Sequence, residues 1–332
     1  MEALQLSKKH FAGIGLLLSS VLTVIFFLYL PIEIDGQRMG NVPLLLINAG
    51  LLAITASAMA VSVLIVLTKK EYVRSHIATL IHFRHLMFLM VKRDFVTRYR
   101  RSVLGVVWSL LNPILTMLVL TMVFSQIFRF EIPGVSFAVY LLSGQLIFGF
   151  FSESTNGAMG SVLAGAGTIK KVYVPKYIFP TTRVLSSVIN LGFSFLAFLI
   201  VFVVTGTAFH PTIFLIPIPI FYLLIFSMGI GMLLSAVAVF FRDITYIYGV
   251  LLTLLNFLTP IFWPVSILPP RVYHLIHLNP MFHFVEYFRA LALYGTIPGL
   301  WTNIICIGFA LAAFFLGLYV KMSQQDKYIL YL

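Results

Sequence analysis

The sequence predicts an all-α protein that crosses a membrane eight times. Of its 332 residues, 61% are hydrophobic and only 10% are charged, whereas soluble domains average about 25% charged residues. Eight apolar runs are long enough for a helix to span the hydrocarbon core, which needs about 20 residues. A transmembrane β-barrel is excluded, because barrel strands are short and alternate between apolar and polar residues.

The first 70 residues predict a transmembrane hairpin as a separate N-terminal domain. One helix spans Phe11–Leu30, a short polar loop with Glu33 and Asp35 follows, and a second helix lies within Asn41–Thr68. A cleaved signal peptide would have a shorter apolar core and a small-residue cleavage site, and the residues after Leu30 offer none. We therefore expect the first helix to stay in the membrane.

Residues 71–101 are too polar to span and predict an amphipathic helix at the cytoplasmic membrane surface. Apolar side chains share one face of this helix and basic ones lie opposite: Phe83, Leu86, Met87 and Met90 against Arg84, His85 and Lys92. Phe88 and Leu89 depart from the pattern. The alternative interpretation is a solvated cytoplasmic linker.

The sharpest boundary in the sequence follows this segment. Five cations lie between Lys92 and Arg101, and no residue of Ser102–Phe128 is charged. Lysine and arginine accumulate on the cytoplasmic side of spanning helices, so the boundary marks a cytoplasmic face. All but four of the 22 lysines and arginines fall in predicted cytoplasmic segments, the exceptions being Arg38, Arg129, Arg271 and Arg289. Both termini are therefore expected in the cytoplasm, with the basic surplus facing anionic lipid headgroups rather than nucleic acid. An acidic protein partner is the alternative.

Residues 102–332 predict a core of six spanning helices. The helices lie within Ser102–Phe128, from Val135 past Phe151, and within Val184–Phe209, Pro211–Phe241, Ile244–Pro270 and Gly299–Val320. A cytoplasmic loop rich in glycine and alanine is expected at Gly157–Pro180. Arg242 and Asp243 form a very short cytoplasmic turn.

Residues 260–298 predict a gate at the outer end of the bundle. Four prolines between Pro260 and Pro270 interrupt the seventh helix. The following segment, with His274, His277 and His283, is too polar to span cleanly. We expect a re-entrant helical hairpin, because irregular backbone at membrane depth is tolerated where protein covers it. The alternative is that this segment only caps the bundle.

The sequence contains no set of residues that would hydrolyse a nucleotide or hold a metal. It has no phosphate-binding loop and no H-E-x-x-H motif, and its single cysteine, Cys306, excludes an internal disulfide and any multi-cysteine metal site. No catalytic residue is predicted. A membrane-embedded glycosyl- or acyltransferase would need a catalytic base, for which only Asp94 and Asp243 are available, each beside an arginine. An ion-coupled flippase would need more intramembrane carboxylates than Glu153 alone.

Glu153 and a set of aromatic residues are the candidates for a transport path. Glu153 lies deep in the apolar run 132–169, where an acidic group costs on the order of 2.5–3.5 kcal/mol on insertion scales. If the fourth helix ended near Ser152, Glu153 would instead lie at headgroup depth. The aromatic candidates are Tyr140, Phe148, Phe150, Phe151, Phe257, Phe262 and Trp263. Aromatic belts at the membrane surface are the alternative explanation.

Four landmarks, in the right order, resemble those of the polysaccharide-exporting ABC permeases, which move O-antigen, capsule and teichoic acid chains. They are Arg93 to Gly105 followed by Trp108 and Asn112-Pro113; Ile169 to Lys176; Phe241-Arg242-Asp243 followed by Thr259 to Pro264; and Leu278-Asn279-Pro280. The resemblance covers about residues 75–332, and the N-terminal hairpin is additional to the family pattern. It implies a six-helix exporter core with an interface helix and outer gate helices.

The resemblance also implies partners and site residues. We expect a homodimer, two copies of an ABC ATPase that bind ATP and Mg, membrane lipids, and a polyprenyl-diphosphate-linked glycan as cargo; this chain itself would bind no cofactor. The cargo entrance would comprise Arg93, Asp94, Arg98, Tyr99, Arg100 and Arg101. The segment that couples to the ATPase would comprise Ile169, Lys170, Lys171, Val172, Tyr173 and Pro175. The channel and gate would comprise Tyr140, Phe148, Phe151, Glu153, Phe257, Phe262, Trp263, Asn279 and Pro280.

Overall fold

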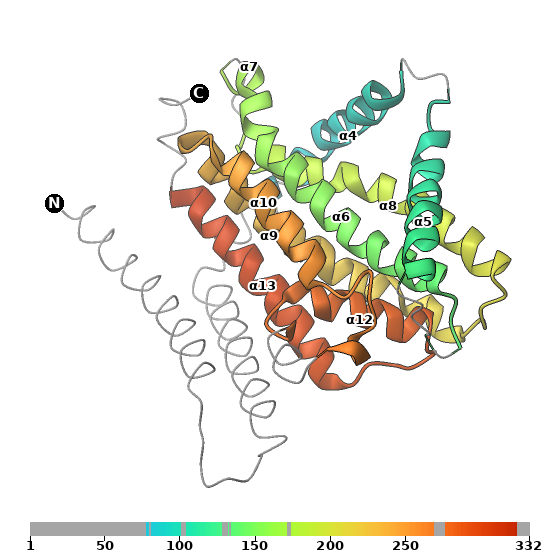
Figure 1. Cartoon of the computed structure of the whole chain (residues 1–332). Helices are drawn as coiled ribbons and strands as arrows, with labels where there is room; N and C mark the ends of the chain where they lie inside the picture. The colour runs from blue at the N-terminus through green and yellow to red at the C-terminus, as the bar shows by residue number, and fades with distance from the viewer. Residues whose placement is uncertain are drawn as a thin grey trace, which may run out of the picture. The chain divides into compact units, whose positions relative to one another are not determined.

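The computed structural model describes residues 78–79, 81–100, 104–127, 132, 134–170, 174–268 and 276–323. The predicted N-terminal hairpin lies outside these residues. Within them the secondary structure is entirely helical, as predicted. The elements are α4 (Arg84–Tyr99), α5 (Val107–Ile127), α6 (Phe137–Ala164), α7 (Ala166–Ile169), α8 (Ile178–Val204), η1 (Pro211–Leu215), α9 (Pro217–Phe240), α10 (Ile244–Leu258), η2 (Val265–Ile267), α12 (Pro280–Ala292) and α13 (Leu300–Ser323) (Figure 1).

Among the described residues, five segments are long and apolar enough to cross a membrane. They correspond to α5, α6, α8, η1 with α9, and α13. Each coincides with one of the six predicted core helices, so the sequence located these spans correctly.

The remaining predicted span, Ile244–Pro270, is shorter in the structure than expected. Helix α10 has 15 residues and ends at Leu258, which gives a length of about 22 Å. Thr259, directly before Pro260, is already extended, with φ −84° and ψ 134°, because a following proline disfavours the helical conformation. The predicted interruption of the seventh helix therefore occurs at Thr259, directly before Pro260, the first of the four prolines.

The predicted loop at Gly157–Pro180 is wrong at both ends. Helix α6 continues to Ala164 and α8 begins at Ile178, which leaves only a short connection that contains α7. Small residues allow this extension because α9 approaches α6 closely: a Cβ on Gly231 would lie only 2.6 Å from the Cβ of Ala158. Tertiary packing thus outweighs the weak helix propensity of glycine in this part of α6.

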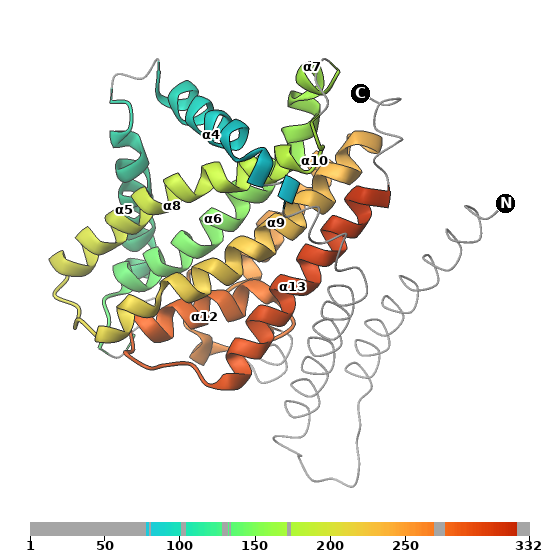
Figure 2. The ribbon, with the colours of Figure 1, turned by 180° about the vertical axis from the view of Figure 1, so that it is seen from behind.

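Helices α9 and α13 form the closest pair of the bundle, side by side in both views of the ribbon (Figures 1 and 2). A Cβ on Gly229 would lie 2.2 Å from the carbonyl carbon of Ala313, and one on Gly317 would lie 2.1 Å from the carbonyl oxygen of Gly229. The two backbones therefore touch. Small residues at such a contact let transmembrane helices gain dispersion energy without a hydrophobic driving force.

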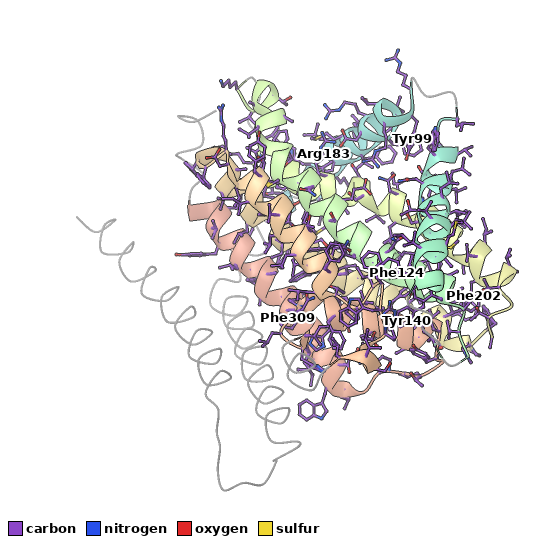
Figure 3. The ribbon with its side chains drawn as sticks, viewed as in Figure 1. Tyr99, Phe124, Tyr140, Arg183, Phe202 and Phe309 are labelled. Carbon is purple, nitrogen blue, oxygen red and sulfur yellow. The ribbon has the colours of Figure 1, made fainter. Side chains whose placement is uncertain are left out.

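Helix α4 packs across the first half of α8 at one end of the bundle, here called the α4 end. Its predicted apolar face is correct, because Phe83, Leu86, Met87 and Met90 pack against a buried cluster around Ile178 and Phe179. The opposite end of the bundle, the α12 end, holds the short buried helix α12 (Figure 1). Figure 3 shows Tyr99 and Arg183 near the first end and Tyr140 near the second.

Candidate functional site

A polar cluster at the α4 end joins four helices around Glu153. Arg98 of α4 lies 2.6 Å from Glu153 of α6 through its Nη1 and Oε1 atoms. Asn190 of α8 donates to the same Oε1 at 2.5 Å, and the Tyr99 hydroxyl donates to the Asn190 Oδ1 at 3.2 Å. The Tyr99 hydroxyl also forms a hydrogen bond with Ser109 of α5. The cluster therefore couples the position of α4 to all three neighbouring helices.

Glu153 lies well inside α6 rather than at its end. The helix continues from Phe137 to Ala164, so the alternative in which it stops near Ser152 is wrong. The side chain is 34% exposed and that of Arg98 is 51% exposed, so both remain accessible. Partial burial alone would lower the pKa of Arg98, but its hydrogen bond and charge attraction to Glu153 outweigh this and raise the pKa. Arg98 is therefore a permanent cation at this position.

A second ion pair holds α4 on α8. Asp94 lies 3.0 Å from Arg183 Nη1 through its Oδ2 atom, which also accepts a hydrogen bond from Ser186 at 3.3 Å. Its other oxygen, Oδ1, lies 3.4 Å from Arg93 Nη2. Asp94 is thus engaged at both oxygens by cations and a hydroxyl. This arrangement suits a structural clamp and argues against the catalytic base that a transferase would require.

Two cavities adjoin the polar cluster. The first, called the entrance cavity, has a volume of about 430 Å³ and is bordered by Arg98, Tyr99, Trp108 and Asn190. The second, called the α6 cavity, has a volume of about 400 Å³ and begins at the same Glu153. Both are also lined by Asn112, Pro113 and Ser194. Shared walls place the two cavities one after the other along α5, α6 and α8.

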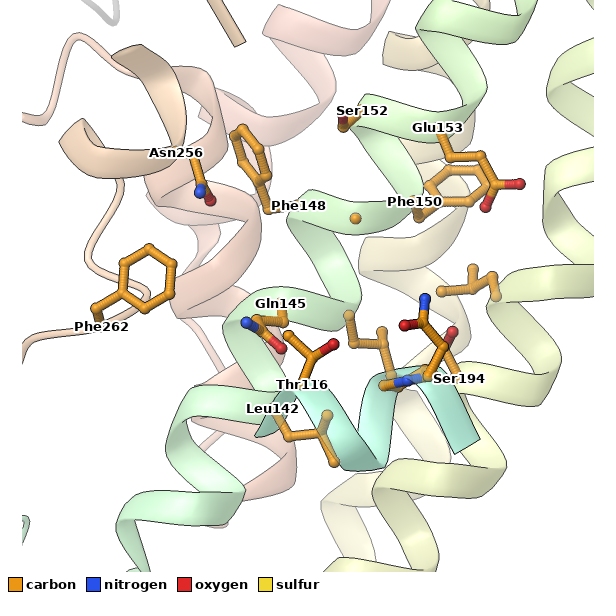
Figure 4. Close-up of a pocket in the computed structure, with 15 residues that line it drawn as sticks. Thr116, Leu142, Gln145, Phe148, Phe150, Ser152, Glu153, Ser194, Asn256 and Phe262 are labelled. Carbon is orange, nitrogen blue, oxygen red and sulfur yellow. The ribbon is translucent and has the colours of Figure 1, made fainter. Parts of the chain in front are cut away.

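The α6 cavity combines polar groups with aromatic rings. Figure 4 shows Phe262, Asn256 and Phe148 on one side, with Glu153 and Ser194 on the other. Gln145 and Thr116 add further hydrogen-bonding groups to its wall. This mixture can bind the hydroxyls and the C–H faces of a sugar chain. It contains no second carboxylate and no group of three metal-binding side chains is found among the described residues.

Phe262 lines the α6 cavity beside two other phenylalanine rings. It is 8% exposed, and its ring stacks on Phe124 of α5 at 5.5 Å between centroids. Phe257 of α10 lies 5.9 Å away from it. Three rings from three segments thus meet at Phe262, and two of them, Phe257 and Phe262, belong to the predicted plug, which stays a prediction.

The backbone around Phe262 is held by Arg289, whose role the sequence did not indicate. Arg289 on α12 is fully buried, and its Nη1 donates to the Pro260 carbonyl at 2.7 Å. Its Nε donates to Ser143 at 3.1 Å and its Nη2 to the Tyr140 carbonyl at 3.2 Å, both on α6. The guanidinium also lies 3.5 Å from the centre of the Tyr140 ring, a cation–π contact. Arg289 therefore connects α12, α6 and the Pro260 turn.

Residues 85–293 match the ABC-2 type transporter family. The chain belongs to this family. It is 31% identical over 225 residues to the O-antigen export system permease protein RfbA of Myxococcus xanthus, covering 66% of this chain and 84% of that protein. It is 27% identical to the protein of the same name from Klebsiella pneumoniae over 251 residues (74% and 95%). It is 29% identical to the polysialic acid transport protein KpsM of Escherichia coli over 237 residues (70% and 91%).

These relationships confirm the predicted family and the function class of a transporter membrane subunit rather than an enzyme. The ABC-2 match includes α4, the polar cluster, both cavities and Arg289. The transferase alternative is set aside, in agreement with the engaged oxygens of Asp94.

Several predicted channel residues of this ABC-2 subunit have structural positions away from the cavities. Phe151 stacks on Phe226 in the core. The Tyr140 hydroxyl donates to the carbonyls of Pro260 and Trp263 at 3.4 and 3.2 Å, so Tyr140 stabilises the turn between these two residues. Asn279 caps α12 by accepting from the Met281 amide at 3.0 Å and donates to Thr259 at 2.8 Å, and Pro280 occupies the first turn of α12.

The remaining predicted residues lie at the α4 end or outside the described ranges. Arg100 is exposed at the end of α4, and Arg242 and Asp243 are exposed between α9 and α10. Ile169 ends α7, Lys170 follows it and is exposed, and Pro175 is partly buried. Four predicted residues fall outside the described part of the chain: Arg101, Lys171, Val172 and Tyr173.

Proposed function

We propose that this ABC-2 subunit exports a polysaccharide linked to a polyprenyl diphosphate across the bacterial cytoplasmic membrane, with the α4 end in the cytoplasm. The main support is the order of groups along α6. A cationic cluster with Arg98 comes first, a polar and aromatic cavity follows, and three rings meet at Phe262 on the wall of that cavity. Relatives named for O-antigen export and polysialic acid transport support a glycan as cargo.

The entrance cavity is the proposed site for the diphosphate of the cargo. Arginine suits this ligand because its planar fork donates in parallel to phosphate oxygens. Arg98 is half exposed and borders the cavity. Helix α4 would lie in the plane of the lipid headgroups with Arg100 at its end and Arg101 next in the sequence. Each cation near an anionic surface contributes about 1 kcal/mol of attraction.

Removing the charge of Arg98 tests this entrance. Arg98→Gln is expected to reduce export at least roughly tenfold, because one charge-assisted contact to phosphate contributes about 1.5–3 kcal/mol. Arg100→Gln and Arg101→Gln are expected to give smaller reductions. Export would be measured as glycan reaching the outer surface, at equal amounts of subunit in the membrane.

Lys92→Gln provides the matched control, because Lys92 is an exposed cation on α4 that borders neither the entrance cavity nor the α6 cavity. Unchanged export by all three arginine variants would show that these cations serve only to orient the chain in the membrane.

A second copy of this chain is proposed to complete the path. Helix α5 and helix α10 carry wide exposed apolar faces, including Val119, Met122, Val250 and Phe257. Polar groups on the same helices, such as Asn112, are also exposed, and polar side chains are costly against lipid. A partner that contributes the same two helices would bury the apolar residues and turn the polar ones toward a wet path.

The ATPase is proposed to dock on the connection between α6 and α8. This connection contains the short helix α7 and Lys170, and it leads through Pro175 into α8. Movement there would pass directly to α6 and α8, which supply Glu153 and Asn190. Two ATPase copies would bind ATP and Mg and supply the energy, because this chain would bind no cofactor.

One experiment addresses the assembly and its orientation. The intact complex is expected to have the mass of two permease and two ATPase subunits, and a cysteine at Lys170 is expected to cross-link to the ATPase. A cysteine at Gly134 is the control that should not cross-link, because Gly134 lies three residues before the end of α6 that contacts α12. A single permease per complex, or cross-linking only at Gly134, would contradict the proposed dimer or its orientation.

A further inference from the structure

One oxygen of Glu153 receives the two donors that an incoming phosphate would use. Oε1 accepts from Arg98 Nη1 at 2.6 Å and from Asn190 Nδ2 at 2.5 Å. Carboxylate and phosphate oxygens are both anionic acceptors that form short, charge-assisted hydrogen bonds with arginine. Glu153 therefore occupies the anion-binding position of this cluster with a group from the protein itself.

The position of Glu153 makes it accessible to a competitor. Its side chain borders the entrance cavity, the α6 cavity and a third cavity of about 80 Å³ next to Asp94 and Arg183. Half of the Arg98 side chain is exposed to the surroundings. Exposed ion pairs contribute only about 0–1 kcal/mol, so an anion of higher charge can take the place of this carboxylate.

Other charges around the cluster favour an anion once Glu153 withdraws. Arg93, Arg98 and Arg183 lie on the facing helices, and Asp94 is the other carboxylate close to them. Asp94 keeps its own partners in Arg183 and Ser186. Without Glu153 the local balance is therefore positive, which suits a diphosphate.

We propose that Glu153 is an internal substitute for the cargo diphosphate: it occupies Arg98 and Asn190 in the empty transporter and is displaced when the cargo binds. This inference rests on the proposed function of the entrance cavity. Displacement removes the tie between α4 and α6, while the Asp94–Arg183 pair keeps α4 on α8. Cargo binding would thus release α6, the helix that leads to the ATPase connection and lines both cavities.

The direct test is the affinity for a polyprenyl diphosphate without glycan, measured with the complete transporter in nanodiscs. Glu153→Gln keeps the size of the side chain and removes its charge, so it is expected to tighten binding roughly twofold to fivefold. Arg98→Gln is expected to weaken binding at least roughly tenfold. Asp243→Asn, which removes an exposed carboxylate at the start of α10, is the charge-matched control and should leave affinity unchanged.

The outcomes separate this inference from the proposed function. Weaker binding by Arg98→Gln together with unchanged or weaker binding by Glu153→Gln would overturn the substitute role and keep the entrance site. Unchanged binding by both variants would overturn both. A second series replaces the probe by phosphatidylglycerol in the nanodisc. If phosphatidylglycerol displaces Glu153 from Arg98 as effectively as the polyprenyl diphosphate does, the site binds membrane phospholipid and cargo recognition is overturned.

A distance measurement covers the case in which Glu153→Gln does not assemble. Spin labels at Val96 on α4 and Asn156 on α6 occupy exposed positions on the two helices that the ion pair joins. The single native cysteine, Cys306, is buried, so labels can be directed to these positions. Adding the polyprenyl diphosphate is expected to broaden or lengthen the α4–α6 distance, and an unchanged distance at saturating probe would overturn the displacement.

Discussion

Replacing Gly229 by leucine is expected to remove almost all folded subunit from the membrane. Any Cβ at this position would lie 2.2 Å from the Ala313 carbonyl carbon, 2.3 Å from the Phe314 nitrogen and 2.4 Å from the Ala313 oxygen. All three atoms belong to the backbone of α13, so no side-chain rotation can relieve the clash. The two helices would have to separate, which removes the closest contact in the bundle.

The measurement is the amount of subunit in purified membranes and its thermal unfolding after extraction. Gly192→Leu is the matched control, because Gly192 lies within α8, is exposed, and a Cβ added there would meet no atom of another helix within 4 Å. We expect this variant to accumulate normally. Normal stability of Gly229→Leu would show that α9 and α13 are not in backbone contact.

The fold was predictable to the extent that composition and proline placement determine it. Length and apolarity located five spans, and the periodicity of Phe83, Leu86, Met87 and Met90 gave the buried face of α4. The end of α6 was not predictable from local sequence, because Gly157 and Gly160 suggest a loop. Their helix is stabilised by α9, whose Gly231 approaches Ala158 although it lies 73 residues further along the chain.

The site was predictable where a charged residue lies within or directly beside an apolar run. Glu153 stood out as a charge in an apolar run, and Arg98 as part of the basic boundary before α5. Their pairing was not predictable, because they lie on different helices with 54 residues between them, and no sequence periodicity relates two such positions. Asn190, the second donor to Glu153, was missed because an uncharged amide within an apolar helix gives a weak signal.

Arg289 was missed for a different reason. Counting positive charges on either side of the membrane treats each arginine as a surface marker, so a fully buried arginine is classed as an outside cation. Its helix does contain a signal, since Phe284, Phe288 and Leu291 surround Arg289 with apolar residues that are all buried. An arginine within such a segment needs internal acceptors, and Ser143, Tyr140 and Pro260 supply them.

The role of Arg289 can be separated from that of Phe262 by comparing leakage with stability. Phe262→Ala is expected to make reconstituted liposomes leak small ions, because a bulky apolar ring closes a pore by excluding water. Its neighbours Phe124 and Phe257 would remain in place. Arg289→Met is expected to leak as well and also to lower stability.

Arg289→Met keeps most of the side-chain volume but removes the guanidinium hydrogen bonds to the Ser143 hydroxyl and to the Tyr140 and Pro260 carbonyls. Loss of one member of such a buried network costs on the order of 3–5 kcal/mol. The Pro260 turn would then lose the hydrogen bond that it receives from Arg289 of α12, and Phe262, two residues later, would be held less firmly. Arg289→Lys, which retains a charge and can reach fewer acceptors, is expected to restore part of the barrier. Tight liposomes and normal export with Arg289→Met would show that Arg289 only fills space, whereas leakage relieved by lysine identifies the charge as the element that positions the gate.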